Sequence, residues 1–467
     1  MGDALTLVLP IAIFWAGAIG LAAFDGRRQM SAWGALVVLL AGFGALAWLA
    51  ARVLGSGPIE TIAGNWPAGV GIRLRADPLG IAFALLSVLV LLVAVAYEAI
   101  GGAETRAFPA LTLFLATGLT GLFLTADAFN FYVFFELSMI SAYVLTAFGE
   151  RLRQLRAAII FAVVNLVGSV LFLLGIVALY HVTGSLDMAD IARRMTFAEQ
   201  NPAILSGALL FVAFGVKLGL FPFHFWLPAV YTGVRPSVAA ILSGALANIG
   251  TYGLLRFGGE LLPRELHLAA PALIALGAAS IVYGGLQAIG RVAPEEVVAY
   301  SAIGQVGYVM IALAVGGAAG YAAAILFAFI NAVNKTLLFL AIDLRGAFVG
   351  PAVAIGALSV AGAPPVAGFF GKAALFRMGL AIGDETERIA IVALIAAGGA
   401  LSLLYMFQAF GRRYLDAQAE AKRRPSSQGR RRLVAAVALL LVGFGCWPEP
   451  LIALSEKAAA VLPGRLP

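Results

Sequence analysis

The stretch FVAFGVKLGLFPFHFWLP, from Phe211 to Pro228, decides the class of this protein and points to its chemistry. It is almost wholly apolar over a length that could span a bilayer, yet it carries Lys217 near its middle and Pro222 five residues later. An ammonium in hydrocarbon costs from about 3 to roughly 10 kcal/mol or more, so an intramembrane lysine is a functional candidate. A proline breaks the helix, which lipid tolerates only where polar groups or water satisfy the freed carbonyls. A charge beside a broken membrane helix indicates an ion path.

The composition is that of a membrane protein. Of the 467 residues, 62% are hydrophobic and 12% are charged, whereas a soluble domain has about 25% charged residues. The mean hydropathy is +0.98. We therefore expect an all-α polytopic membrane protein, and the number of apolar spans replaces the usual count of soluble domains.

Other classes of protein and site are disfavoured. The formal charge of +7 does not indicate nucleic-acid binding, because the arginines lie in short loops between apolar stretches. The single cysteine, Cys446, excludes a disulfide within the chain and argues against a cysteine-based metal site, so we expect neither cofactor nor metal. Met1 to Asp3 lacks the basic segment of a signal peptide, and we expect the first apolar run to remain as a span.

Hydropathy predicts fourteen spans. They lie near 4–24, 32–54, 79–99, 108–125, 130–148, 157–180, 203–222, 237–256, 268–289, 296–316, 320–342, 352–382, 388–411 and 433–453. Loops after odd-numbered spans hold seventeen of the 31 Lys and Arg residues, which predicts that these loops are cytoplasmic and that both termini are extracytoplasmic. The basic run RRYLDAQAEAKRRPSSQGRRR (412–432) favours a topological anchor over a site for anionic lipid or a partner.

Lysine usage singles out a few residues. The chain has 26 arginines and five lysines, and three of the lysines lie inside spans: Lys217, Lys335 and Lys372. Lysine gives up its proton readily on burial and arginine does not. Among the 24 acids, only Glu136 clearly lies within a span; Glu98, Asp127 and Asp343 lie near span ends. Because these groups cannot all be charged at low cost, we expect at least one lysine to be neutral part of the time. The alternative for each lysine is a static partner that locks two helices.

Three predicted spans carry polar faces. Their members are Asn331, Asn334 and Lys335; Ser301, Gln305 and Tyr308; and Asn248, Thr251 and Tyr252. Residues three and four apart share a helical face. Such faces hold helices together about as often as they line water, so both interpretations stay open.

A second broken span resembles the first in design. In GAPPVAGFFGK, the breakers Pro364 and Pro365 come shortly before Lys372. Interrupted segments in corresponding positions indicate an inverted-repeat transporter, here with repeats over spans 4–8 and 9–13. We divide the chain into 1–107 (spans 1–3), 108–256 (first repeat), 257–411 (second repeat) and 412–467 (basic loop and span 14).

Several long motifs resemble one family. They are FLTADAFNFYVFFELSMISAYVL (123–145), KLGLFPFHFWLPAVYTGVRPSVAAILSGALANIGTYGLLR (217–256), EEVVAYSAIGQVGYVMIALA (295–314), GALSVAGAPPVAGFFGK (356–372) and GIRLRADPLG (71–80). These motifs, in their order along the chain, resemble those of the proton-translocating subunits shared by Mrp-type cation/proton antiporters, respiratory complex I and membrane-bound hydrogenases. Within that family, FNFYVFFEL most resembles the D-type antiporter subunit.

The resemblance implies roles for individual residues. Glu136 matches the family's span 5 glutamate and Lys217 its span 7 lysine, an ion pair that gates proton loading. Lys335 matches the span 11 lysine on the central hydrophilic axis, and Lys372 the span 12 lysine at the exit. Pairing favours the ammonium, and separating the pair would drive its proton towards Lys335 and Lys372.

The chain departs from the family at two positions. Many members carry a lysine where this chain has Asn248, and a histidine where it has Asn331. Asparagine can hold water but cannot store a proton, so the path between Lys217 and Lys335 is expected to rely on water. The supporting side chains would be those of Asn248, Tyr252, Ser301, Gln305 and Asn331. His224 could feed protons or could be an interfacial packing residue.

The resemblance also implies a setting and leaves three functions open. It implies a bacterial or archaeal inner membrane and partners like the A-, B-, C-, E-, F- and G-type proteins of the Mrp antiporter, with protons exchanged for Na⁺ or K⁺. The first function is a D-type antiporter subunit. The second is the related pumping subunit of a redox-driven complex, and the third is a scaffold that keeps the fold without pumping. Tolerance of Lys217→Ala would favour the scaffold.

Overall fold

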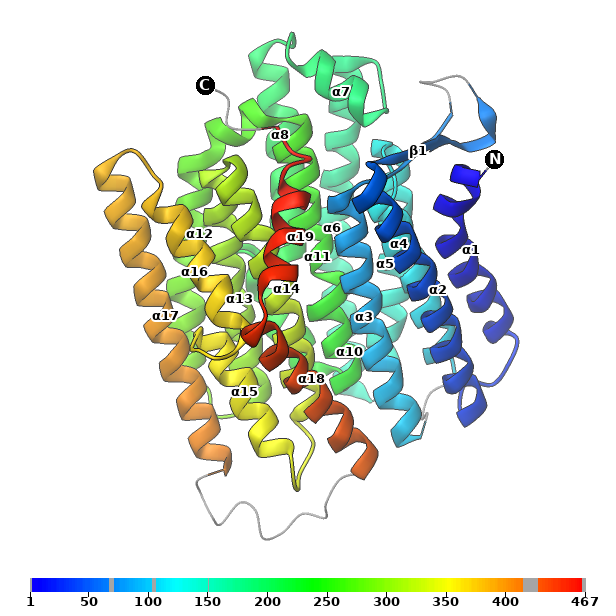
Figure 1. The fold of residues 1–467 in the computed structure, drawn as a ribbon, viewed down its shortest axis with the longest axis vertical. Helices are drawn as coiled ribbons and strands as arrows, with labels where there is room; N and C mark the ends of the chain where they lie inside the picture. Colours follow the sequence, from blue (N-terminus) through cyan, green and yellow to red (C-terminus); the bar gives the residue numbers. More distant parts are fainter. Residues whose placement is uncertain (1, 67–70, 103–105, 150, 415–426, 464–467) are drawn as a thin grey trace.

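The chain folds into long helices that run side by side between two faces (Figure 1). The computed structural model describes residues 2–66, 71–102, 106–149, 151–414 and 427–463. In this part of the chain, eleven helices are long and apolar enough to cross a membrane, or twelve if one bent pair is counted as a span. The expected class, an all-α polytopic membrane protein, is confirmed.

The N-terminal segment contributes three helices and a small hairpin. Its elements are α1 (Gly2–Ala22), α2 (Gln29–Ser56), β1 (Ile59–Ile62), η1 (Ala63–Asn65), β2 (Arg73–Ala76) and α3 (Pro78–Gly101). The strands are antiparallel, with Ile59 opposite Ala76. The Asp77 carboxylate accepts a hydrogen bond from the Gly80 backbone N–H at 2.9 Å and so caps α3. α1 and α2 form one edge of the molecule, whereas α3 is mostly buried.

The next segment covers predicted spans 4 to 8. It contains α4 (Phe108–Phe123), α5 (Ala128–Ala147), α6 (Leu152–Thr183), α7 (Met188–Met195), α8 (Gln200–Leu218), η2 (Phe223–Phe225), α9 (Trp226–Gly233), α10 (Pro236–Ile241), η3 (Leu242–Leu246), α11 (Asn248–Gly253) and η4 (Leu254–Leu261). α8 ends where Gly219 takes a φ of +67°, and Pro222 lies in the interruption before η2. The crossing continues through α9 to Gly233, so the predicted end at residue 222 is too early.

The predicted span 8 is not a regular α-helix. Its turns η3 and η4 are π-helical and flank α11, which begins at Asn248. The span also runs on to Leu261, beyond the predicted end at residue 256. π-Helical turns are rare and are frequent at functional sites.

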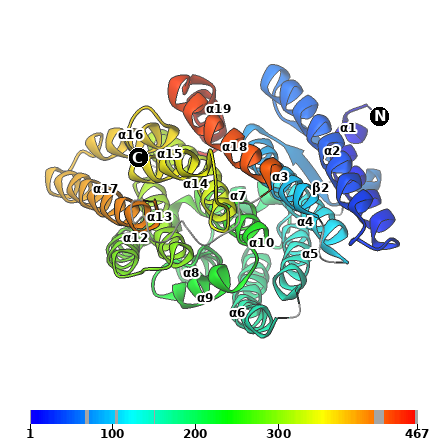
Figure 2. The same ribbon diagram turned by 90° about the horizontal axis from the view of Figure 1, so that it is seen from below.

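The last segment surrounds one central helix. It contains α12 (Pro263–Ile289), α13 (Pro294–Val315), α14 (Gly317–Ala341), α15 (Val349–Ala361), α16 (Ala367–Leu380), α17 (Glu385–Tyr414), α18 (Gln428–Cys446) and α19 (Glu449–Ala459). The apolar window of α14 is entirely buried, and this helix contacts α3, α10, α13, α15, α16, α18 and α19. Figure 2 shows α14 near the middle of the end view and α17 at the edge opposite α1.

Two of the later spans are interrupted. Between α15 and α16, Gly362 has a φ of +81°, and Pro364 and Pro365 fill the gap before Ala367. The predicted span 433–453 contains a bend, because α18 and α19 meet at an angle of 78°. Pro448 and Pro450, which donate no backbone hydrogen bond, lie at this bend.

Arginines at the two ends of the basic run donate to carbonyls at helix ends. The Arg413 guanidinium donates to the carbonyls of Ala341, Ile342 and Leu344, just past the C-terminus of α14. Arg430 similarly donates to the Tyr97 carbonyl at 2.9 Å, near the end of α3. Residues 415–426 of the run lie outside the described residues. The described arginines thus bond to backbone carbonyls at or near the C-terminal ends of helices.

Candidate functional site

Lys217 lies in the last turn of α8, beside the helix break. Its ammonium donates to the Asn165 carbonyl on α6 at 3.3 Å and lies 4.1 Å from the centre of the Phe135 ring. The side chain is buried. A carbonyl and an aromatic face both stabilise a cation, though less strongly than a carboxylate does.

Glu136 lies on α5 next to Phe135 but does not reach the lysine. Its Oε1 atom is buried without a hydrogen-bond partner, although the carboxylate is near enough to act on Lys217 electrostatically. The contact ion pair implied by the family resemblance is therefore not formed here. The physical reason is that the Asn165 carbonyl and the Phe135 ring already hold the ammonium.

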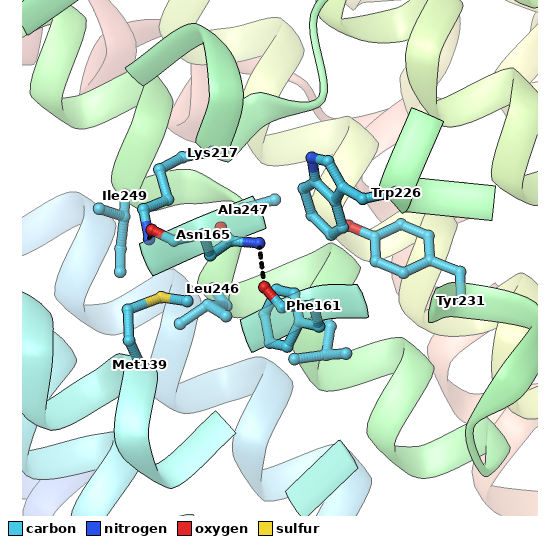
Figure 3. A pocket seen from close by; sticks show the side chains of 10 residues that line it. Met139, Phe161, Asn165, Lys217, Trp226, Tyr231, Leu246, Ala247 and Ile249 are labelled. Atoms are coloured by element: carbon cyan, nitrogen blue, oxygen red, sulfur yellow. Dashed lines mark hydrogen bonds between the residues drawn. The ribbon is translucent and has the colours of Figure 1, made fainter. Parts of the chain in front are cut away.

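A small cavity lies beside Lys217 (Figure 3). Its volume is about 10 Å³, which is room for roughly one water molecule. Its lining comprises Met139, Phe161, Asn165, Lys217, Trp226, Tyr231, Leu242, Leu246, Ala247 and Ile249. The Asn165 amide donates to the Phe161 carbonyl at 2.9 Å, which fixes the side chain in the cavity wall. Sequence reasoning missed Asn165, whose only signal was an amide within the apolar span 157–180.

Asn248 lies beside this cavity, because its neighbours in the sequence, Ala247 and Ile249, both line it. Its side-chain amide donates to the Gly244 carbonyl at 2.7 Å, within its own span. In this structure Asn248 therefore bonds to the backbone of the π-helical segment rather than to a lysine.

Tyr252 belongs to a different cluster. Its hydroxyl donates to the Phe123 carbonyl at 2.9 Å and accepts from Arg256 Nε at 2.9 Å. The Arg256 guanidinium contacts both Asp77 oxygens at 2.5 Å and Glu260 at 2.7 Å. In the described structure the Tyr252 hydroxyl thus bonds to Phe123 and Arg256, and its support of a water path with Ser301 and Gln305 stays a prediction.

Asp77 is the central acid of that ionic cluster. Burial alone would raise the pKa of its carboxyl, but the charges of Arg256 and Arg75 outweigh burial and hold the pKa below its ordinary value. Arg75 Nε lies 3.0 Å from the same carboxylate, and its guanidinium also contacts Glu260 at 2.7 Å. Sequence reasoning noted the phrase GIRLRADPLG but not this pairing, since Arg256 is 179 residues away from Asp77.

Ser301 and Gln305 meet a residue that sequence reasoning missed. The Ser301 hydroxyl lies 2.8 Å from the Tyr405 hydroxyl of α17, and Gln305 Nε2 donates to the same oxygen at 3.3 Å. All three side chains are buried. Tyr308, on the same face of α13, lies with its ring 5.8 Å from the Lys372 ammonium. The predicted polar face of α13 thus links α17 to Lys372.

Lys335 and its two asparagines lie on the buried central helix. Asn331, Asn334 and Lys335 are at most 8% exposed. In the described structure the Oδ1 atoms of Asn331 and Asn334 have no hydrogen-bond partner. Buried acceptors of this kind can take a hydrogen bond from water or from a protonated side chain.

Lys372 is held much as Lys217 is. Its ammonium donates at 2.7 Å to the carbonyl of Ala361, the last residue of α15, across the break between α15 and α16. It also lines a groove of about 580 Å³ between α16 and α17. Both lysines therefore combine a helix break with a neutral carbonyl as hydrogen-bond acceptor.

His224 packs among aromatic rings. Its ring stacks on Phe221 with centroids 5.3 Å apart and lies 4.3 Å from the Tyr283 ring. The side chain is buried, and its Nδ1 atom has no hydrogen-bond partner within the described chain. The geometry shows aromatic packing around His224, and its role in feeding protons stays a prediction. No group of three His, Cys, Asp or Glu side chains that could hold a metal occurs among the described residues.

Comparisons with known proteins identify the family of the chain. Residues 125–347 match the family described as NADH:quinone oxidoreductase/Mrp antiporter, TM. The chain is 31% identical over 432 residues to a putative antiporter subunit mnhD2 of Staphylococcus aureus, covering 86% of this chain and 84% of that protein. It is also 31% identical over 438 residues to the D-type subunit of a Na⁺/H⁺ antiporter of Alkalihalophilus pseudofirmus, covering 88% of each. A chain of the Mrp complex from Dietzia sp. has the same fold, with a TM-score of 0.89, 24% identity and coverage of 99% of this chain and 98% of that one.

Proposed function

Because the chain belongs to the family of Mrp-type antiporter D-type subunits, we propose that it carries protons along its buried lysines while the whole complex exports Na⁺ or K⁺. The protein is a component of a membrane transporter and works with other subunits. Its partners would resemble the A-, B-, C-, E-, F- and G-type proteins of the Mrp antiporter. The protein would be located in a bacterial or archaeal inner membrane, with both termini on the extracytoplasmic side.

One observation carries this proposal. Three lysines are buried among the helices, and Lys217 and Lys372 each donate to a backbone carbonyl beside a helix break. A cation held by a neutral acceptor is bound less tightly than one in a carboxylate pair, so its proton is available for transfer. A lysine that merely locked two helices would be stabilised better by a carboxylate.

The proposed mechanism begins at Glu136 and Lys217. An approach of Glu136 towards Lys217 would favour the ammonium, and their separation would leave burial to favour the neutral amine. The released proton would pass by water towards Lys335, supported by Asn248 and Asn331, and then towards Lys372.

Proton flux in inverted vesicles that contain the full complex tests this proposal. We expect Glu136→Ala and Lys217→Ala to reduce Na⁺- or K⁺-driven proton movement at least tenfold. Lys217→Arg should fail equally, because it keeps the charge but does not release the proton. The matched control is Lys457→Ala, which removes an exposed lysine from α19.

Activity that survives Lys217→Ala at matched expression would contradict the proposal and favour a scaffold. Loss of flux in Lys457→Ala as well would show that the assay reports assembly rather than proton transfer.

A further inference from the structure

Tyr231 on α9 lies between two cavities. On one side its ring lines the 10 Å³ cavity that contains Lys217, as Figure 3 shows. On the other side it lines a second cavity of about 640 Å³. Its own side chain is only 3% exposed, so the two spaces meet at this ring.

The larger cavity is polar and belongs to one face of the molecule. Its wall comes from the ends of α3, α9 and α14 and the starts of α6, α10, α13 and α18, beside the connections that join these helices to their neighbours. The charged residues that line it are Glu98, Arg151, Arg153, Arg235, Glu295, Asp343 and Arg430. These connections follow odd-numbered spans, which are the loops expected in the cytoplasm. Such a lining holds water, whereas the cavity beside Lys217 is mostly apolar.

A buried acid is fixed in the wall of the larger cavity. Glu98 is 5% exposed, accepts a hydrogen bond of 2.5 Å from the Ser237 hydroxyl and lies 3.9 Å from Arg430 Nη2. Arg430 is itself held by the Tyr97 carbonyl at 2.9 Å and lies over the Tyr97 ring. A carboxylate in this position can transfer protons between the loops and the interior of the cavity.

Aromatic packing holds Tyr231 in place. Its ring meets Phe339 edge to face at a centroid distance of 5.6 Å and Trp226 at 6.2 Å. The Trp226 indole donates to the Val216 carbonyl at 3.0 Å, next to Lys217 in the chain. α9 has eight residues and follows the break, so a change at the break would move this ring directly.

We propose that Tyr231 is the barrier that closes the Lys217 cavity to the polar cavity, and that its displacement admits protons collected at Glu98. This inference rests on the proposed function of Lys217. It adds two residues to the proton path: Tyr231 as a barrier and Glu98 as a proton acceptor at the mouth of the polar cavity.

Thiol labelling of the whole complex in nanodiscs tests the barrier. In a Cys446→Ser background, Met139→Cys places a thiol in the inner cavity and Thr232→Cys places one in the outer cavity. We expect a small charged thiol reagent to modify the outer cysteine readily and the inner one slowly. Adding Tyr231→Ala should raise the rate at the inner cysteine at least tenfold, whereas Tyr231→Phe, which keeps the ring, should not.

The proposal would be overturned if Tyr231→Ala did not raise the labelling rate of the inner cysteine above the rate measured with Tyr231 in place. Should Met139→Cys fail to fold, Ile249→Cys replaces it in the same cavity. An unchanged rate at the outer cysteine shows that Tyr231→Ala leaves the fold intact.

Flux measurements separate this inference from the proposed function, because labelling does not require transport. In the complex with Tyr231→Ala we expect a proton leak that needs no Na⁺ or K⁺, and Lys217→Ala should remove it. A leak-free Tyr231→Ala variant with raised labelling would overturn the role in proton access while leaving the role of Lys217 in place.

Discussion

Lys217 and Lys372 lie far apart in the sequence and yet their ammonium groups have the same surroundings. Each donates to one carbonyl of a preceding helix, at 3.3 and 2.7 Å, and each has an aromatic ring within 6 Å. In both cases the broken helix supplies the room for this arrangement. A proton carrier needs an environment that tolerates both the charged and the neutral side chain, and a single neutral acceptor provides one.

Tyr405 offers a test of the path between these lysines. Tyr405→Phe removes the hydroxyl that Ser301 and Gln305 share. Two buried polar groups then lose a partner, which costs about 1–3 kcal/mol each where water does not replace it. We expect a several-fold fall in proton flux in vesicles at matched expression.

The control for Tyr405→Phe is Tyr300→Phe on α13. It also removes a hydroxyl, but Tyr300 contacts Tyr283 and Arg291 through its ring, which phenylalanine keeps. Equal flux in the two variants would contradict a role for Tyr405 in the path.

Asp77 should make stability depend on acid. The pKa of its carboxyl is lowered from the ordinary 3.8, so the ionised form stabilises the fold at all pH values above that number. This contribution is lost only as the pH falls below 3.8 through the lowered pKa. Asp77→Asn removes one of the two carboxylates that pair with the buried Arg256 guanidinium and should cost about 3 kcal/mol at neutral pH.

Unfolding of the detergent-solubilised complex from pH 7 down to pH 3 measures this effect. We expect the difference between wild type and Asp77→Asn to be constant down to about pH 4 and to shrink below it. A difference that stays constant through pH 3 would show that Asp77 acts only through its shape.

The burial of candidate residues was predicted better than the contacts between side chains. Burial of all three lysines followed from their place in apolar runs, because hydropathy reports depth in the membrane directly. Asn165, Tyr405 and the Arg256 pairing did not follow, since each depends on which helix faces which. Periodicity along one helix gives no such information.

At the scale of helices, the breaks are fixed by packing from neighbours. Gly445 on α18 lies against the Pro365 carbonyl, so a Cβ at this position would overlap with the backbone of the break before Lys372. We expect Gly445→Ala to displace that break, lower the thermal stability and reduce proton flux several-fold.

Gly443 on the same helix is the matched control for Gly445. A Cβ at Gly443 meets nothing within 4 Å, so Gly443→Ala should be neutral or slightly stabilising. Similar melting temperatures and flux for the two variants would show that the contact between α18 and the break has no influence on Lys372.

The C-terminal end of α14 depends on one arginine. Arg413 donates to three carbonyls there, and hydrogen bonds from a charged donor are worth about 1.5–3 kcal/mol. We expect Arg413→Ala to lower the melting temperature of the complex by more than Arg432→Ala, in which the lost side chain is exposed. Arg413→Lys should recover only part of the loss, because a lysine cannot bridge several carbonyls with a rigid fork. Equal melting temperatures for the two alanine variants would contradict the capping role.

Helix positions were predicted well and helix irregularities less well. Each of the fourteen predicted stretches contains helix in the structure, because long apolar runs have little alternative in lipid. Breaks at Pro222 and at Pro364 and Pro365 were visible because proline acts locally. The π-helical turns on either side of the helix that begins at Asn248 were not predicted. The proposed division into two inverted repeats stays a prediction.

The whole molecule has two chemically different ends. Arginine caps and the 640 Å³ polar cavity lie on the face of the odd-numbered loops, and the Asp77 cluster lies at the opposite ends of the helices. α1 begins and α19 ends on the face away from the end of α17 and the start of α18 (Figure 1). The buried lysines lie between these faces, so protons must cross from one chemical environment to the other.

This asymmetry predicts the orientation of the chain. In a Cys446→Ser background, we expect Glu199→Cys, between α7 and α8, to react with an impermeant maleimide in intact cells. Ser427→Cys, near the C-terminal end of the basic run, should react only after the membrane is opened, because the arginine-rich loops are expected in the cytoplasm. The opposite labelling pattern would show that the chain has the opposite orientation in the membrane. The polar cavity at Tyr231 would then open outside the cell, and the same residues would describe a release route rather than a route of uptake from the cytoplasm.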